Sequence, residues 1–325
     1  MNASINVIAV VGPTASGKTA LSIALARALN GEIINGDAMQ VYKELDIGTA
    51  KIQASEMEGV PHHFFDVKEP TEQFSVAEYQ QAVRWWIEDI QSRGKMPIIV
   101  GGSGMYIQAV LFDYRFTEQA GDPNVRAKLE EELEEFGAEK LYTRLEKLDP
   151  KSAQSIHPNN HRRLVRALEI LEVTGRTKQD HEQQQGNQSM FRELIIGLDV
   201  PRELLYERID QRVDMMVDAG LFQEVESLWK KGIRETQSVQ AIGYKELITY
   251  FNEQITKEQA IEAVKKNTRN YAKRQLTYFR NKLPVQWVNA NQPQKDIFKR
   301  TFEIIEDYEK CVGNNLFNKD REAIE

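Results

Sequence analysis

The sequence predicts an α/β fold in which a parallel β-sheet is flanked by helices, with an all-helical insertion added to it. Two observations predict the sheet. Short apolar runs rich in β-branched residues recur along the chain, and segments of helical periodicity separate them. A third observation predicts the insertion, because residues 122–186 show helical periodicity without a convincing strand. A chain of 325 residues can bury one large core or two modest ones.

The first half of the predicted sheet comes from three apolar runs. Ile5–Val11 has the length and composition of a buried strand, and the helical period begins just after Lys18. A second strand is expected at Gly31–Gly36. A helix over 75–94 then leads into a third strand at Met96–Gly102.

The second half returns to the sheet after the insertion, which is expected to begin with Asp122 as a helix cap and Pro123 at the first helical position. A polar loop is expected over Gln179–Met190, followed by a strand over Phe191–Val200 that rejoins the sheet. Long helices over 201–283 and a last short strand over Val285–Ala290 complete the expected elements. We therefore expect a discontinuous core over 1–115 and 190–290, a helical insertion over 116–189 and a C-terminal helical tail over 291–325.

Composition excludes several classes of protein. The chain is 41% hydrophobic and 28% charged, and it contains no apolar run near the length of a membrane span. The first residues show no basic segment or cleavage site of a signal peptide, so we expect a cytoplasmic protein without membrane contact. The single cysteine, Cys311, excludes an internal disulfide and a cysteine-rich zinc module.

A phosphate-binding loop lies between the first strand and its helix. It fits the pattern G-x-x-x-x-G-K-[ST] with Gly12, Pro13, Thr14, Ala15, Ser16, Gly17, Lys18 and Thr19. Backbone N–H groups and a helix N-terminus converge on an anion in such a loop, Lys18 adds a charge, and the Thr19 hydroxyl is placed to ligate Mg²⁺. The alternative is a glycine-rich turn with a solvated lysine. The loop predicts a P-loop NTPase-like core.

The surroundings of this loop do not match a nucleotide hydrolase. The strand at Met96–Gly102 ends in "GGSG" without the carboxylate that would hold the water shell of Mg²⁺. Asp37 instead follows the second strand, where it is either a catalytic acid or base or a turn residue. Ser103 is either a ligand contact or a helix cap. His62 and His63 lack a nearby carboxylate at helical spacing, which favours a structural role.

Basic residues gather in two segments, although the net charge is −7. Residues 265–282 contain seven Lys or Arg and no acid, on a helix expected over Ile261–Lys282. A second group, Arg162, Arg163 and Arg166, begins a helix of the insertion. Taken alone, each basic cluster is best explained as a solvent-exposed helix face or as a set of ion pairs with Glu130–Glu135. Two clusters beside a phosphate site favour a nucleic acid or another large anion.

The chain resembles the bacterial tRNA dimethylallyltransferases over roughly Val7 to Leu283. The resemblance rests on seven motifs in order: "GPTASGKT", "NGDAMQVYKELDIGTAK", "GVPHHFFD", "VGGSGMYIQAVL", "IHPNNHRRLVRALEI", "VQAIGYKE" and "YAKRQLTYFRN". It implies transfer of a dimethylallyl group from dimethylallyl diphosphate to N6 of adenosine 37, in tRNAs that read codons beginning with U. It also implies Mg²⁺ as cofactor, and we expect a monomer.

The resemblance also implies roles for individual residues. The loop Gly12–Thr19 would hold the donor diphosphate, Asp37 would be the general base, and Ser103 would contact substrate at a position where the family usually has threonine. Arg212 would help to hold the diphosphate. Ala38 departs from the family's usual serine. The implied tRNA contacts are Asp37, Ala38, Met39, Gln40, Ser103, Arg126, Arg162, Arg163, Arg166, Gln240, Gly243, Tyr244, Lys273, Arg274, Gln275 and Arg280, some of them in the insertion.

Other functions share part of this pattern. An isopentenyl transferase acting on free adenine nucleotides would have the same loop and Asp37, but it would not need two basic clusters. A P-loop small-molecule kinase fits the loop and the sheet, and it leaves the basic helix unexplained. An RNA-binding module with a vestigial loop gives Asp37 no purpose.

Overall fold

The computed structural model describes residues 4–116, 121–177 and 188–312. The chain forms two compact units, one made of Met1–Leu111 with Ser189–Glu325 and the other of Phe112–Gln188. Most of the loop expected at Gln179–Met190 and the end of the expected tail lie outside the described residues. Each unit is described by itself.

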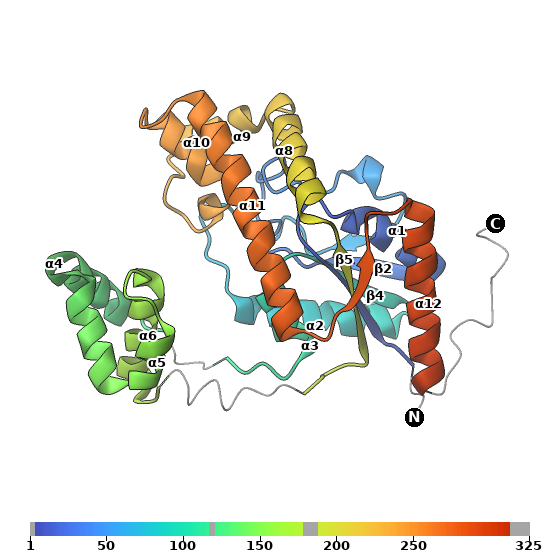
Figure 1. Cartoon of the computed structure of the whole chain (residues 1–325), viewed down its shortest axis with the longest axis horizontal. Helices are drawn as coiled ribbons and strands as arrows, with labels where there is room; N and C mark the ends of the chain where they lie inside the picture. Colours follow the sequence, from blue (N-terminus) through green and yellow to red (C-terminus); the bar gives the residue numbers. More distant parts are fainter. Residues whose placement is uncertain (1–3, 117–120, 178–187, 313–325) are drawn as a thin grey trace. The chain divides into compact units, whose positions relative to one another are not determined.

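The first unit is built on a six-stranded parallel sheet with strand order β3–β2–β4–β1–β5–β6, which confirms the predicted α/β class (Figure 1). In chain order its strands are β1 Val7–Val11, β2 Gly31–Asn35, β3 His62–His63, β4 Met96–Gly101, β5 Glu193–Asp199 and β6 Gln286–Asn289. Val10 of β1 pairs with Val100 on one side and with Ile196 on the other. β3 was not predicted, because two residues are too few to show a period.

Helices cover both faces of this sheet. The crossovers β1–α1–β2 and β3–α2–β4 run across the sheet in opposite directions, so right-handed connections put α1 and α2 on opposite faces. α3 packs with α2, and α12 packs beside α1 (Figure 1). The four helices span α1 Lys18–Ala28, α2 Val76–Ser92, α3 Gly104–Leu111 and α12 Gln294–Val312.

The core of the first unit lies between these layers. Ile8, Val10, Leu25, Ile98 and Ile196 are fully buried in one apolar cluster. Burial of each such side chain stabilises the fold by about 1.5–3 kcal/mol. This burial explains why the strands read as continuous apolar runs, as expected for a sheet covered on both faces.

A group of helices connects β5 to β6: α8 Arg202–Asp218, α9 Leu221–Lys230, α10 Tyr244–Phe251 and α11 Lys257–Lys282, with the short turn η2 Ser238–Gln240 between α9 and α10. Another short turn, η1 Ala54–Glu56, lies between β2 and β3. The start expected for the basic helix, Ile261, was wrong. Thr256 and Gln259 form a capping box, and α11 therefore begins about one turn earlier.

Over its described residues, the second unit contains the helices α4 Pro123–Leu148, α5 Pro150–Ser155 and α6 His161–Thr174. The Asp122 carboxylate caps α4 by accepting from Asn124 N at 2.8 Å, and Pro123 follows it as expected. α4 is broken at Gly137, whose φ of 79° lies in the left-handed region. The break lets both halves bury apolar residues against α6, in a core that includes Leu129, Leu141, Leu145, Leu164 and Leu168.

The chain leaves and re-enters the first unit at neighbouring points. Met190 N donates to Leu111 O at 2.8 Å, so the residues on either side of the second unit are hydrogen-bonded to each other. Among the residues that the structure describes, none of the helices has the length and apolarity needed to cross a bilayer.

Candidate active site

The site lies at the carboxyl ends of three neighbouring strands. The phosphate loop follows β1, Asp37 follows β2, and the turn Gly102–Ser103 follows β4. Because β4 lies between β2 and β1, this turn lies between Asp37 and the phosphate loop. Ligands of open parallel sheets bind at such ends.

The phosphate loop is shaped by backbone conformations that favour small residues. Gly12 and Gly17 have φ of 148° and 95°, and Ala15 also has a positive φ. A Cβ at Gly12 would meet the Leu198 carbonyl oxygen at 3.2 Å. The Lys18 ammonium donates to Gly12 O at 3.0 Å and to Pro13 O at 2.6 Å, and the exposed Thr19 lies in the first turn of α1. Backbone N–H groups at this helix N-terminus provide an anion site.

Two charged groups from distant parts of the chain, Arg212 and Asp37, act on Lys18. Burial lowers the pKa of Lys18 to about 7; the positive charge of Arg212, on α8, lowers it further, whereas the negative charge of Asp37 raises it. Burial also lowers the pKa of Arg212. The structure therefore brings together the residues that the sequence analysis assigned to the diphosphate and to proton transfer.

Asp37 takes the turn position that its sequence allowed, and the pKa of its carboxyl group is also shifted. Its Oδ1 accepts from Met39 N at 2.9 Å, which is a turn interaction. Burial raises the pKa of its carboxyl group, while the Met39 N–H, the charge of Lys18 and the Gln40 N–H act in the opposite direction. Ser103 Oγ accepts from Ala38 N at 3.1 Å, which fixes the turn after β4 to the segment carrying Asp37.

Three tyrosines that were not expected at the site lie within reach of the charge of Asp37. Burial raises the pKa of Tyr79, Tyr106 and Tyr271, and for each of them the charge of Asp37 is the second cause. The rings of Tyr79 and Tyr106 meet edge to face at 5.1 Å. Tyr79 is fully buried, whereas Tyr106 and Tyr271 are partly exposed, and partly exposed aromatic rings suit a flat base and an apolar five-carbon chain. One signal was available, because Tyr271, Gln275 and Tyr278 recur at helical spacing on one face of α11.

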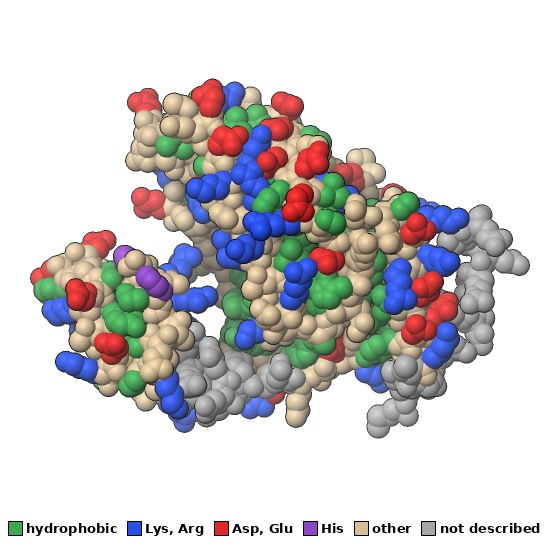
Figure 2. Space-filling model, viewed as in Figure 1, with side chains coloured by type: hydrophobic (Ala, Val, Ile, Leu, Met, Phe, Trp, Pro, Cys, Tyr) green, Lys and Arg blue, Asp and Glu red, His purple; other side chains and the backbone are tan. Residues whose placement is uncertain are grey.

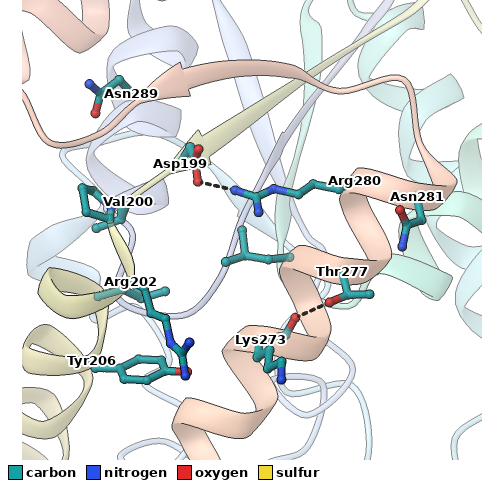
Figure 3. A pocket seen from close by; sticks show the side chains of 12 residues that line it. Asp199, Val200, Arg202, Tyr206, Lys273, Thr277, Arg280, Asn281 and Asn289 are labelled. Carbon is teal, nitrogen blue, oxygen red and sulfur yellow. Dashed lines mark hydrogen bonds and ion pairs between the residues drawn. The ribbon is translucent and has the colours of Figure 1, made fainter.

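The other side of α11 borders an open groove of about 710 Å³ (Figure 3). Arg202, Lys273 and Arg280 supply its positive charge, and Asp199 pairs with Arg280 at 2.9 Å. Figure 2 shows Lys and Arg side chains gathered over α11. The exposed Arg274 lies over the Tyr271 ring at 5.7 Å. This surface has the charge that a phosphate backbone requires.

The segment after Asp37 is anchored by α9. Glu224 accepts from the backbone N–H groups of three consecutive residues, Asp46, Ile47 and Gly48, at 3.0, 2.8 and 3.0 Å. The hydroxyl of Tyr244 donates to the same carboxylate, and the tyrosine is fully buried. Tyr244 therefore shapes this surface from within. Just before Tyr244, Gln240 is exposed and Gly243 N donates to Glu246 Oε2 at 2.8 Å. In the segment after Asp37, Gln40 Nε2 donates to Thr49 O at 2.9 Å.

In the second unit, two of the expected arginines share one acid. Arg126 and Arg166 contact Glu169 at 2.7 and 2.8 Å, and the side chain of Glu169 is 2% exposed. Arg162 and Arg163 are exposed. Within 121–177, Glu132 of the acidic helix pairs with Arg144, not with this cluster.

The histidine pair takes part in packing. His63 stacks on Trp86 with ring centroids 4.1 Å apart, and its Nε2 lies 2.6 Å from a Glu32 carboxylate oxygen. Among the described residues, no group of three His, Cys, Asp or Glu side chains is arranged to hold a metal ion.

The fold and site define a class of protein. The charges of the loop lysine Lys18 and of the half-buried Asp37 act on each other, and β4 ends without the acid of nucleotide hydrolases. Together with the parallel sheet, these features define a P-loop protein of the group-transfer class.

Comparisons with known proteins specify the family. The model of the IPP transferase family matches residues 40–282. A tRNA dimethylallyltransferase from Bacillus licheniformis is 54% identical over 90% of this chain and 95% of its own length. The structure of a full-length tRNA isopentenylpyrophosphate transferase from Bacillus halodurans matches with a TM-score of 0.71 and 46% identity, covering 94% of this chain and 98% of that one. A eukaryotic dimethylallyltransferase acting on tRNA matches with a TM-score of 0.78 and 32% identity, over 96% of this chain and 81% of its own. The chain belongs to the IPP transferase family, which confirms the resemblance found in its motifs.

Proposed function

We propose that the chain transfers a dimethylallyl group from dimethylallyl diphosphate to N6 of adenosine 37, in tRNAs that read codons beginning with U. Family membership and relatives named tRNA dimethylallyltransferase supply the reaction class. The observation that carries the proposal is the joint placement of Asp37 and the loop lysine Lys18 at the carboxyl ends of neighbouring strands, where their charges act on each other. In this proposal, Asp37 is the proton acceptor and the loop of Lys18 holds the leaving group.

The chain's own residues account for the chemistry. The amino nitrogen of adenine attacks the allylic carbon, a C–N bond forms, and the C–O bond to diphosphate breaks with its electron pair leaving on diphosphate. Asp37 takes the proton that the amine loses. Burial raises its pKa, which makes its carboxylate a stronger proton acceptor than an exposed aspartate. Lys18 and Arg212 stabilise the charge that develops on the diphosphate.

The donor set of the site fits Mg²⁺ that arrives with the diphosphate. Thr19 is exposed in the first turn of α1, where a P-loop hydroxyl ligates the ion. Mg²⁺ keeps several waters and takes its remaining ligands from substrate phosphates, so a carboxylate cage is not required. When bound, the ion would neutralise charge on the leaving diphosphate. Thr19 is the residue we expect to hold it.

For tRNA we propose three surfaces. The first is the segment Asp37–Gln40 at the pocket mouth, with Ser103 beside it. The second is the basic face of α11, where Lys273 and Arg274 are exposed. The third is the arginine group of the second unit: Arg126, Arg162, Arg163 and Arg166. Adenosine 37 must leave its stack to reach Asp37, which costs less from a single-stranded loop than from a duplex.

One copy of the chain supplies the phosphate loop, the proposed base and the basic surfaces, so we expect a monomer to be active. The tRNA substrate places the proposed reaction in the cytoplasm.

A mass-shift assay tests the proposal. With dimethylallyl diphosphate, Mg²⁺ and unmodified tRNA bearing A36-A37-A38, one adenosine should gain a five-carbon allyl group in place of a hydrogen. AMP, offered as the acceptor in a parallel reaction, should remain unmodified. Equal transfer to AMP would assign the chain to free nucleotides and overturn the tRNA proposal.

A further inference from the structure

Gln275 connects two loops of the site from the inner face of α11. Its side chain is buried, with 5% of the residue exposed. Its Oε1 accepts from Thr14 N at 3.2 Å in the phosphate loop, and its Nε2 donates to Gly102 O at 3.0 Å in the turn after β4. Thr14 offers an N–H and Gly102 a carbonyl oxygen. A side-chain amide supplies the matching acceptor and donor in one orientation.

The hydrogen bonds continue from this turn to the segment of the proposed base. Ser103 N donates to Gly36 O at 3.2 Å, and Ser103 Oγ accepts from Ala38 N at 3.1 Å. These contacts flank Asp37 on both sides. A chain of hydrogen bonds therefore runs from the phosphate loop, through the Gln275 amide and the β4 turn, to the backbone around Asp37.

Close packing around the turn after β4 explains why glycines occupy the positions in and beside it. A Cβ at Gly102 would lie 2.0 Å from Gln275 Nε2, and one at Gly104 would lie 2.4 Å from the Tyr278 ring. A Cβ at Gly101 would lie 2.0 Å from Gly36 O. The turn is thus packed directly against α11 on one side and against the segment leading to Asp37 on the other. Gly102 in the turn, together with Gly101 and Gly104 on either side of it, allows this close approach.

We propose that Gln275 is a positioning residue that sets the distance between the loop holding the diphosphate and the segment carrying the base. The inference rests on the proposed function, because alkyl transfer requires the attacking nitrogen, the allylic carbon and the leaving oxygen to lie nearly on one line. A misplacement of about 1 Å in such an arrangement can cost a factor of ~10² in rate. Gln275 lies within the stretch expected to contact tRNA. Both polar atoms of its amide are hydrogen-bonded to Thr14 and Gly102, so we expect Gln275 to act on tRNA modification through these loops and not by binding tRNA.

The test compares two amide residues on α11. Gln275→Met keeps the length of the side chain and removes both hydrogen bonds. Asn267→Leu is the matched control, since Asn267 Nδ2 donates to Glu246 Oε1 at 2.6 Å, linking α11 to α10 without touching the phosphate loop. For Gln275→Met we expect kcat in steady-state transfer to fall by ~10². The KM for tRNA should stay within about twofold of the wild-type value. Binding of inorganic diphosphate with Mg²⁺ should also weaken. Asn267→Leu should lower Tm and leave kcat and diphosphate binding unchanged.

Two results would overturn the proposal. One is wild-type kcat in Gln275→Met. The other is an equal loss of kcat in both variants, which would indicate a general structural role for the amides of α11. If Gln275→Met does not fold, Gln275→Glu decides, because it keeps the acceptor for Thr14 N and places an oxygen against Gly102 O. It should show the same loss of kcat, and wild-type turnover in that variant would overturn the idea.

A double-mutant cycle gives an independent readout. Gly102→Ala should displace the Gln275 amide, so the losses of Gly102→Ala and Gln275→Met should not add. Additive losses would place the two residues in separate roles and count against the proposal. If wild-type protein fails to modify tRNA, the proposed function fails, while diphosphate binding by Gln275→Met still tests the positioning role.

Discussion

At the scale of single residues, Asp37 and Lys18 are shifted toward their neutral forms by the same cause. Burial raises the pKa of the carboxyl group and lowers that of the ammonium, and each charge offsets part of the other's shift. Shifts of this kind concentrate at functional sites, because a buried charge is costly unless a ligand or partner compensates it. The proposed diphosphate and adenine would supply that compensation.

Asp37→Asn tests the proposed base. The amide keeps the size of the side chain and cannot take the proton, so transfer should slow by at least ~10² while the Kd for tRNA changes little. Single-turnover rates and filter binding measure the two quantities. Asp89→Asn, on α2 and paired with Arg93 in the wild type, is the control and should transfer at the wild-type rate. Unchanged transfer by Asp37→Asn would remove the residue from the mechanism.

Lys18 gives the site a pH dependence with a definite sign. Its pKa of about 7 lies below the ordinary 10.5, so in the ligand-free protein the ammonium is charged below pH 7 and largely neutral above it. Diphosphate favours the charged form, and its affinity should fall as pH rises above 7, with proton uptake on binding. Calorimetry should measure the affinity for diphosphate against pH in the wild type and in Lys18→Met. The ionisation of diphosphate is the same in both measurements, so the difference between the two pH slopes is the contribution of Lys18. Equal pH slopes would contradict it.

The same shift predicts a gain in stability when the charge is removed. The folded-state pKa lies below the unfolded value, so the charged lysine opposes folding, fully at pH below about 7 and progressively less up to pH 10.5. The Tm of ligand-free Lys18→Met at pH 6 should therefore exceed that of wild type.

At the scale of elements, α9 anchors the segment after Asp37 through Glu224. Glu224→Ala leaves three backbone N–H groups and the buried Tyr244 hydroxyl without their acceptor. Each unsatisfied buried donor costs about 1–3 kcal/mol, so the free energy of unfolding should fall by about 3 kcal/mol or more. Urea unfolding measures it. Glu226→Ala, on the same helix with a side chain that is 40% exposed and paired with Lys230, should change it by less than about 0.5 kcal/mol.

The basic face of α11 should determine the salt dependence of tRNA binding. Replacing Lys273 and Arg274 by Ala removes two exposed charges, so the slope of log K against log salt should flatten by roughly 1.4–1.8. Binding of diphosphate should be spared. The pair Lys295→Ala and Lys299→Ala on α12 removes the same number of exposed charges from another helix of the unit and should leave the slope unchanged. A flattening of equal size in both pairs would mean that the position of the charges does not matter.

At the scale of the whole molecule, the second unit should be removable. Leu111 and Met190 are hydrogen-bonded across its point of insertion, so deletion of 112–188 with a short linker should leave the first unit folded. Circular dichroism and diphosphate binding should match the full chain, while tRNA affinity should fall with the loss of Arg126, Arg162, Arg163 and Arg166. A variant with 112–188 replaced by a Gly/Ser linker of equal length separates lost contacts from a shortened chain. Full tRNA affinity in either variant would exclude the second unit from RNA binding.

The spacing of apolar residues and the phosphate-loop motif predicted most of the fold. Apolar runs placed five of the six strands, and "GPTASGKT" placed the phosphate loop between a strand and a helix. The errors fall where the signal is short or depends on one conformation. β3 has two residues, the start of α11 depends on a capping box, and the break in α4 depends on the positive φ of Gly137.

The sequence by itself determined the class of fold, the phosphate loop and the family, because each is written in contiguous residues whose spacing matches a local geometry. The tertiary structure decided what lies around that loop. Lys18 and Arg212 are far apart in the chain, and the charge of Arg212 lowers the pKa of Lys18 only because folding brings α8 near the phosphate loop. Gln275 reads in sequence as one polar residue of a basic helix, and packing turns its amide inward to Thr14 and Gly102. Contacts of this kind arise from strand order and crossovers, which no local pattern encodes.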